Sequence, residues 1–166
     1  MMSQFQNSDY IMRMIEQFAR ALASIITARK AQQHEEAFVQ IQHASQLYLE
    51  SDVLELIKLS PKGIIEKFRG RSGRVDVEKC VVCADLLYEM ALISEAKGIT
   101  ELSDHIKMQC LYLYVTAIPM DKQFETTGYL EKVDTLKTGL TTVQFPDWYL
   151  FEMEAFEKFI SKKSAG

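Results

Sequence analysis

Apolar side chains recur at three- and four-residue intervals along most of the chain, which is the spacing of one face of an α-helix. In residues 9–30 the apolar positions share one side, and charged and polar side chains share the other. Asn7 and Ser8 are both good N-cap residues, so we expect this helix to begin near residue 8. The side expected to face the core consists of Ile11, Ile15, Phe18, Leu22, Ile25 and Ile26.

A polar break at residues 32–34 separates this helix from a second one. A stripe of small and large apolar side chains marks the second helix from Ala37 to Tyr48. Because the break is short, we expect the two helices to lie antiparallel.

The stretch after Ser51 is the least regular part of the chain. Its pattern predicts a short helix at 52–59. A second short helix is expected to start at Pro61, because proline suits the first turn of a helix, and to end near Phe68.

Residues 78–97 have apolar positions on two sides, which predicts a helix covered by neighbours on both flanks. We therefore expect this helix at the centre of the molecule. Gly98 suits the left-handed position that follows a helix. Thr100 is expected to cap the next helix, residues 101–118, which should end before Pro119.

Two further helices are expected near the C-terminus. The first spans residues 124–138 and ends at Gly139. Pro146 and Asp147 begin the second, which is dense in aromatic side chains. Its tail, residues 161–164, is expected to fray.

These elements predict a single all-α domain over residues 1–166, built of antiparallel helical hairpins. Small residues on a seven-residue spacing let paired helices approach closely, and Gly98, Ser103 and Cys110 resemble the small positions of the tetratricopeptide repeat. We therefore expect the hairpins to stack in a tetratricopeptide-like array. The expected parts are a first helix pair (8–51), an irregular connection (52–74), a central helix pair (75–118) and C-terminal helices (122–163).

Longer segments carry a second resemblance. The stretches at 9–17 (DYIMRMIEQ), 35–37 (EEA), 76–79 (DVEK) and 84–87 (ADLL) are similar to a functionally uncharacterised family of small bacterial all-helical proteins, a domain of unknown function with tetratricopeptide-like helix pairs. The resemblance implies the same fold and a cytoplasmic location. It implies no activity and no binding residues.

Composition narrows the range of functions. Hydrophobic residues make up 48% of the 166 positions, enough to form one core in a soluble protein. The net charge of −4 provides no overall cationic field, so nucleic-acid binding is not expected. No uncharged apolar stretch is long enough to cross a bilayer, and three cysteines fit a reducing compartment, so we expect a cytoplasmic protein without membrane contact.

No catalytic motif is readable in the chain. Cys80 and Cys83 have CxxC spacing, which packing in the core of a helix explains and which zinc or redox chemistry could also use. The histidines, at positions 34, 43 and 105, do not have the spacing of helical metal ligands and fit surface or capping roles. Phosphate-binding glycine motifs and the nucleophile turn of hydrolases are missing. We therefore expect no enzyme activity, cofactor or metal.

Two stretches remain as candidates for contact with other molecules. One is a basic loop with four cations between glycines, which could bind phosphate through its side chains and free backbone N–H groups or could be a solvated connection. The other is the last helix, whose aromatic side chains either pack into the core or bind a second copy of the chain. The candidate residues are Lys67, Arg69, Arg71 and Arg74 in the loop, and Trp148, Tyr149, Phe151, Phe156 and Phe159 in the helix.

From these features we expect a non-catalytic interaction or scaffold module whose protein partner the sequence does not name. The alternative is a regulator that binds an anionic ligand or nucleic acid through the loop at 67–74. A homodimer is a further hypothesis, based on the aromatic helix.

Overall fold

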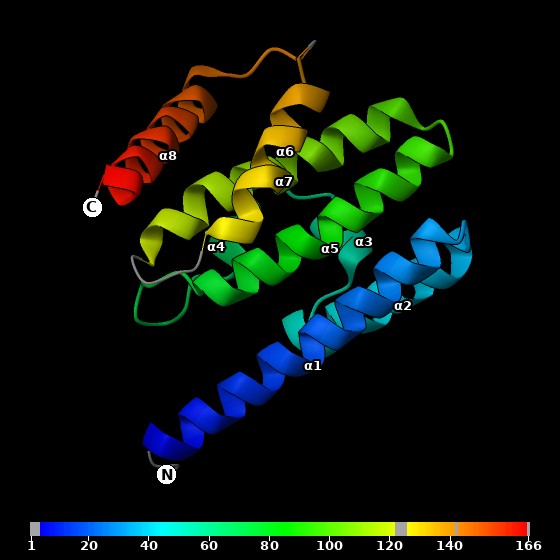
Figure 1. Cartoon of the computed structure of the whole chain (residues 1–166), viewed down its shortest axis with the longest axis horizontal. Coiled ribbons are helices and arrows are strands. Elements are labelled where there is room, and N and C mark those ends of the chain that lie inside the picture. Colours follow the sequence, from blue (N-terminus) through cyan, green and yellow to red (C-terminus); the bar gives the residue numbers. More distant parts are fainter. Residues whose placement is uncertain (1–3, 122–125, 142, 166) are drawn as a thin grey trace.

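The computed structural model describes residues 4–121, 126–141 and 143–165 (Figure 1). Those residues form eight α-helices and one 3-10 turn, with no β-strand and only an isolated antiparallel bridge between Arg69 and Val75. The expected all-α class is confirmed. None of the described helices is both long and apolar enough to cross a lipid bilayer. The elements are α1 (Gln4–Lys30), α2 (His34–Leu49), α3 (Val53–Leu56), α4 (Pro61–Lys67), α5 (Val77–Ala96), α6 (Thr100–Ala117), η1 (Ile118–Met120), α7 (Thr127–Gly139) and α8 (Asp147–Ala165).

Local capping chemistry sets three of the helix starts. The side chains of Asp52, Ser60 and Asp76 each accept a hydrogen bond from a backbone N–H two or three residues further on, at 2.9, 3.0 and 3.1 Å. These bonds satisfy N–H groups that have no partner within the helix. Pro61 occupies the first turn of α4, as predicted, because its missing N–H costs nothing there.

Two predicted helix starts were wrong. α1 begins at Gln4 instead of near residue 8, so the helix already includes residues 7 and 8. α6 begins at Thr100 itself, after Ile99, and no side-chain hydrogen bond caps it. A good capping residue marks where a helix can begin, and here the helix continues beyond it.

The ends of the later helices also differ in part from the prediction. Gly98 has the expected left-handed backbone, with φ of 79°. The chain continues as a 3-10 turn through Pro119 after α6 has ended. α7 starts at Thr127, whereas the predicted start at 124 lies outside the described residues. The tail at 161–164, expected to fray, is the last turn of α8.

The helices are arranged around α5 (Figure 1). α1 and α2 form one hairpin, and α5 packs between this hairpin and α6. α7 and α8 cover other parts of α6, and the short α4 also packs against α6. α5 therefore has neighbours on both flanks, as the two-sided apolar pattern predicted.

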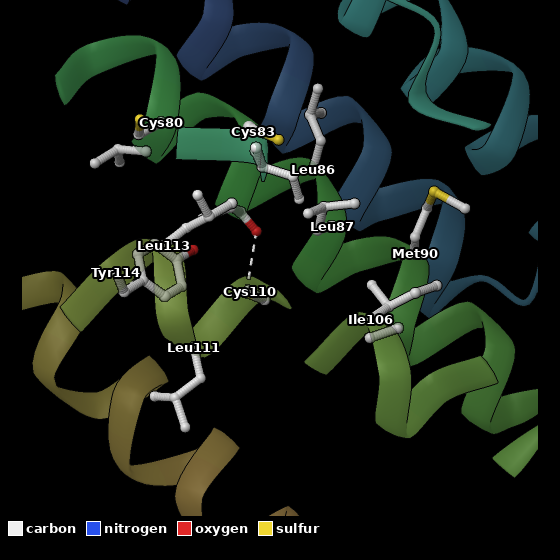
Figure 2. Close-up of a cluster of buried hydrophobic side chains, with 14 of the residues drawn as sticks. Cys80, Cys83, Leu86, Leu87, Met90, Ile106, Cys110, Leu111, Leu113 and Tyr114 are labelled. Atoms are coloured by element: carbon white, nitrogen blue, oxygen red, sulfur yellow. Dashed lines mark hydrogen bonds between the residues drawn. The ribbon is translucent and has the colours of Figure 1, made fainter. Parts of the chain in front are cut away.

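The core is densest where α5 meets α6. Leu86 and Leu87 of α5 and Leu111 and Leu113 of α6 are all fully buried, and Figure 2 shows them in one cluster, with Leu111 on the side of α6 away from α5. Small side chains let the two helices approach closely. The hydroxyl of Ser103 on α6 donates to the carbonyl of Ala91 on α5 at 2.9 Å, so the small-residue spacing does mark a close helix contact.

Candidate functional site

The basic loop is more ordered internally than the sequence suggested. The guanidinium of Arg69 donates to both carboxylate oxygens of Glu66, at 2.8 and 2.9 Å, and to the carbonyl of Gly73 at 2.7 Å. The hydrogen bond to Glu66, and after it the negative charge of that carboxylate, raise the pKa of Arg69. Arg69 therefore holds the loop together, and its guanidinium is already paired within the chain.

The expectation that backbone N–H groups of the loop are free is also wrong in part. The N–H groups of Gly70 and Gly73 donate to carbonyls within the loop, at 2.8 and 3.0 Å. Lys67, Arg71 and Arg74 are exposed, and none of the three makes an ion pair within the described ranges. Three of the four predicted cations thus remain open to solvent on a closed turn.

The aromatic residues of α8 divide into a buried and an exposed group. Tyr149 and Phe156 are buried, and the Tyr149 hydroxyl donates to the carbonyl of Met108 on α6 at 2.6 Å. Phe159 is partly buried against the core. Of the five candidates, Phe151, 68% exposed, and Trp148, 39% exposed, are the ones open to a partner. Tyr149 and Phe156 therefore serve the core, which is one of the two roles that the sequence left open, and they drop out as interface candidates.

Trp148 also has a neighbour within the chain. The ammonium of Lys62 lies over its ring, 4.4 Å from the centroid, which is a cation–π contact between α4 and α8. Leu150, 41% exposed, adjoins Phe151 and was not among the sequence candidates. The exposed large apolar side chains among the described residues of α8 are thus three neighbours in the sequence, Trp148, Leu150 and Phe151.

The CxxC cysteines lie inside the molecule. Cys80 and Cys83 are buried in α5 (Figure 2). Burial raises the pKa of the Cys80 thiol to about 12 and that of Cys83 further, so both stay protonated at neutral pH. Within the described ranges, no three His, Cys, Asp or Glu side chains lie close enough together to hold a metal ion. Packing is the role that this environment favours.

A buried polar cluster centres on Asp85 of α5, which sequence reasoning did not single out. Its carboxylate accepts hydrogen bonds from Tyr114 at 2.5 Å, from Lys132 at 3.2 Å and from Tyr129 at 3.4 Å. Asp85 is 4% exposed, and burial raises its pKa even though Lys132 and the hydroxyls favour the charged form. The one available signal was a carboxylate in an otherwise apolar stretch of α5. Its partners come from α6 and α7.

α1 is 27 residues long and α2 only 16, so the first turns of α1 extend beyond its hairpin partner (Figure 1). The extended part carries exposed apolar side chains. Tyr10 is 52% exposed, Ile11 42% and Ile15 52%. Ile11 and Ile15 were predicted to face the core, and that prediction was wrong because no element of the described chain covers this part of the stripe. The first buried residue of the stripe is Phe18.

The extended part of α1 and the beginning of α5 enclose a groove of about 670 Å³, which we call the α1–α5 groove. Phe18 and Tyr48 both line the groove and meet edge to face, with ring centroids 5.3 Å apart. Asp85 lies at the same site, so the polar cluster faces the groove. The lining residues are Tyr10, Ile11, Met14, Ile15, Phe18, Ala19 and Leu22 of α1; Tyr48; Asp76, Glu78, Lys79, Val81, Val82 and Asp85 of the α5 region; and Asp121 and Tyr129.

Known proteins provide no template for this site. No family model, curated protein or solved structure matches the chain. The function is therefore argued from the residues themselves.

The two walls of the groove have different chemistry. The α1 wall is apolar, whereas the α5 wall carries the carboxylates of Asp76 and Glu78 beside the apolar side chains of Val81 and Val82. Burial, together with the negative charges of Asp76 and Asp121, raises the pKa of Glu78. The groove thus combines an apolar surface with an acidic edge.

Proposed function

We propose that the protein is a non-catalytic interaction or scaffold module that binds part of another protein in the α1–α5 groove. The observation that carries this proposal is the exposure of Tyr10, Ile11 and Ile15 on a helix whose later turns pack in the core. Covering apolar surface releases about 25 cal/mol per Å², so an open apolar stripe favours association. The stripe and the opposite wall of α5 together form a groove, a shape suited to one protein segment.

The arrangement of the hairpins supports the same proposal. The α1–α2 and α5–α6 hairpins lie side by side, which supports stacking of the tetratricopeptide type. In stacked hairpins each pair covers one face of its neighbour and leaves a surface that can bind a segment of another protein.

The alternative proposal is a regulator that binds an anionic ligand or nucleic acid through the basic loop. The exposed side chains of Lys67, Arg71 and Arg74 support it. Against it, Arg69 is bonded to Glu66 and Gly73. Lys67 at the end of α4 and two exposed arginines on the turn after it give a more solvated surface than the groove, so we place the interaction module first.

A quantitative pull-down with the full chain tests the main proposal. Ile11→Gln combined with Ile15→Gln replaces two exposed groove residues by polar ones, while Met12→Gln makes the same kind of change at a residue 57% exposed outside the groove lining. We expect proteins captured from native lysate by the wild type to be lost with the double variant and kept with Met12→Gln. Equal capture by all three forms would refute the groove as the binding site.

A further inference from the structure

We infer that the occupant of the α1–α5 groove is an amphipathic helix of another protein, with apolar side chains toward α1 and lysine or arginine along the edge that faces α5. This inference rests on the proposed function and adds the chemistry of the partner. It follows from the length of the groove, the chemistry of its two walls and the charges of the chain's own exposed helix.

The length of the groove fits about three turns of helix. Its α1 wall extends from Tyr10 to Leu22, which at 1.5 Å per residue is about 18 Å. The α1 wall presents side chains in helical rows, into which the ridges of another helix pack. The described residues contain no strand whose edge could pair with an extended peptide. A helix is therefore the segment that this surface fits.

The apolar wall defines one face of that helix. Ile11 and Ile15 are four residues apart and lie on the same side of α1, with Tyr10 and Met14 beside them. A partner would match them with apolar residues repeated every three or four positions. Val81 and Val82 extend this apolar surface across the groove onto α5.

The negative charge of the α5 wall defines which side chains the partner helix should carry along its edge. Among the lining residues that the structure describes, the carboxylates of Asp76 and Glu78 are exposed there beside the ammonium of Lys79, and Asp121 lies at the same edge. Burial, and after it the negative charges of Asp76 and Asp121, raise the pKa of Glu78, so its ionised form is already penalised. A lysine or arginine of the partner at this edge would offset that penalty, whereas a carboxylate would add to it.

The cationic side chains of the partner are expected to meet Asp76 and Glu78, and not the buried Asp85. Asp85, the buried carboxylate of the lining, already has Lys132 as its partner, 3.2 Å away. The side chains of Asp76 and Glu78 are exposed at the rim, where a long cationic side chain can reach them while its charge stays near water.

A second copy of the exposed part of α1 does not provide the positive charge that this acidic edge favours. Its charged residues are two acids and two bases, Asp9, Glu16, Arg13 and Arg20, so their charges cancel. At 100° per residue all four lie on the side of α1 opposite Ile11. A second α1 that turned its apolar side into the groove would point these charges away from Asp76 and Glu78.

The test uses synthetic helical peptides of about fourteen residues, labelled for fluorescence anisotropy and titrated with the full chain. One peptide carries leucines at helical spacing and lysines at its edges. A second replaces each lysine by glutamate, and a third keeps the lysine composition with the leucine spacing scrambled. We expect the first to bind at least about tenfold more tightly than either control, and to weaken as salt rises from about 50 to about 300 mM.

Variants of the protein locate the site. Ile15→Gln should weaken the leucine–lysine peptide about tenfold, and Met12→Gln should change its affinity less than about twofold. Glu78→Gln should reduce the preference for lysine over glutamate peptides and leave the effect of leucine spacing in place. Glu78 is exposed, so this substitution is not expected to disturb the fold.

The outcomes separate this inference from the proposed function. If lysine and glutamate peptides bind equally and both need Ile15, the acidic edge does not select the partner and the inference is wrong, while the interaction module stands. If the chain dimerises and Ile15→Gln abolishes the dimer, the groove belongs to a second copy and the inference is also wrong. If no peptide binds and no captured protein depends on Ile11 and Ile15, both proposals fail.

Discussion

The ion pair between Arg29 and Glu89 fastens α1 to α5 next to the core. Nε of Arg29 donates to Oε1 of Glu89 at 2.6 Å. The Glu89 side chain is 3% exposed and the Arg29 side chain 20% exposed. Arg29→Met keeps most of the aliphatic length and leaves a buried carboxylate without its cation. Glu89→Gln keeps a hydrogen-bond acceptor and leaves a guanidinium that already reaches solvent.

The two substitutions should therefore have unequal costs. Removing one partner of a buried ion pair costs about 3–5 kcal/mol, and water that reaches Arg29 places Arg29→Met at the lower end, about 3 kcal/mol. Glu89→Gln exchanges an ion pair for a hydrogen bond from the same guanidinium to an uncharged amide oxygen, a loss of about 1 kcal/mol. The expected difference in the free energy of unfolding is about 2 kcal/mol.

Urea unfolding followed by far-UV circular dichroism measures both values, provided that the m-values of the variants match that of the wild type. Equal losses for the two variants, or a loss below about 1 kcal/mol for Arg29→Met, would refute the reasoning. The first result would mean that Glu89 is no more buried than Arg29. The second would mean that α1 is not held to α5 by this pair.

Four further predictions concern other parts of the molecule. Leu87→Ala should cost about 2–5 kcal/mol in urea unfolding because Leu87 is fully buried, and a loss under about 1 kcal/mol would place it outside the core. Burial raises the pKa of Asp85, so the folded protein holds this proton more tightly than the unfolded chain, and the free energy of unfolding should fall as the pH rises from about 4 through the raised pKa. Asp85→Asn should flatten that part of the pH profile, and an unchanged slope would contradict the buried position of the carboxylate. Arg71→Ala with Arg74→Ala should remove any salt-sensitive retention on heparin, which is the signal that the alternative proposal requires. If the exposed patch of α8 forms a homodimer, light scattering should show a dimer for the wild type and a monomer for Phe151→Ser, and a wild-type monomer at micromolar concentration would contradict the hypothesis.

Local chemistry explains the parts of the fold that could be predicted from sequence. Ser60 and Pro61 determine the start of α4, the first by its capping hydrogen bond and the second by lacking an N–H that would need a partner. Gly98 itself adopts the left-handed conformation that ends α5. Each depends on atoms within a few residues of the chain. Thr100 shows the limit of such rules, because the helix includes it and leaves its capping capacity unused.

The groove could be predicted only in part, because periodicity identifies an apolar side and not what covers it. Ile11, Ile15 and Phe18 belong to one stripe, yet only Phe18 is covered. Coverage depends on where α2 ends and on how α5 lies, which are long-range properties. The same limit applies to Asp85, whose partners Tyr114 and Lys132 are 29 and 47 positions away in the sequence.

The extended part of α1 should also open more easily than the rest of the helix. Residues 9–17 have few buried neighbours, so their backbone hydrogen bonds break in local fluctuations that leave the core intact. Their amide hydrogens should exchange with deuterium long before those of α5, whose opening requires the whole core to unfold. A molecule seated beside Ile15 would slow that exchange, so residues 9–17 would report occupancy even if the rest of the protein did not change.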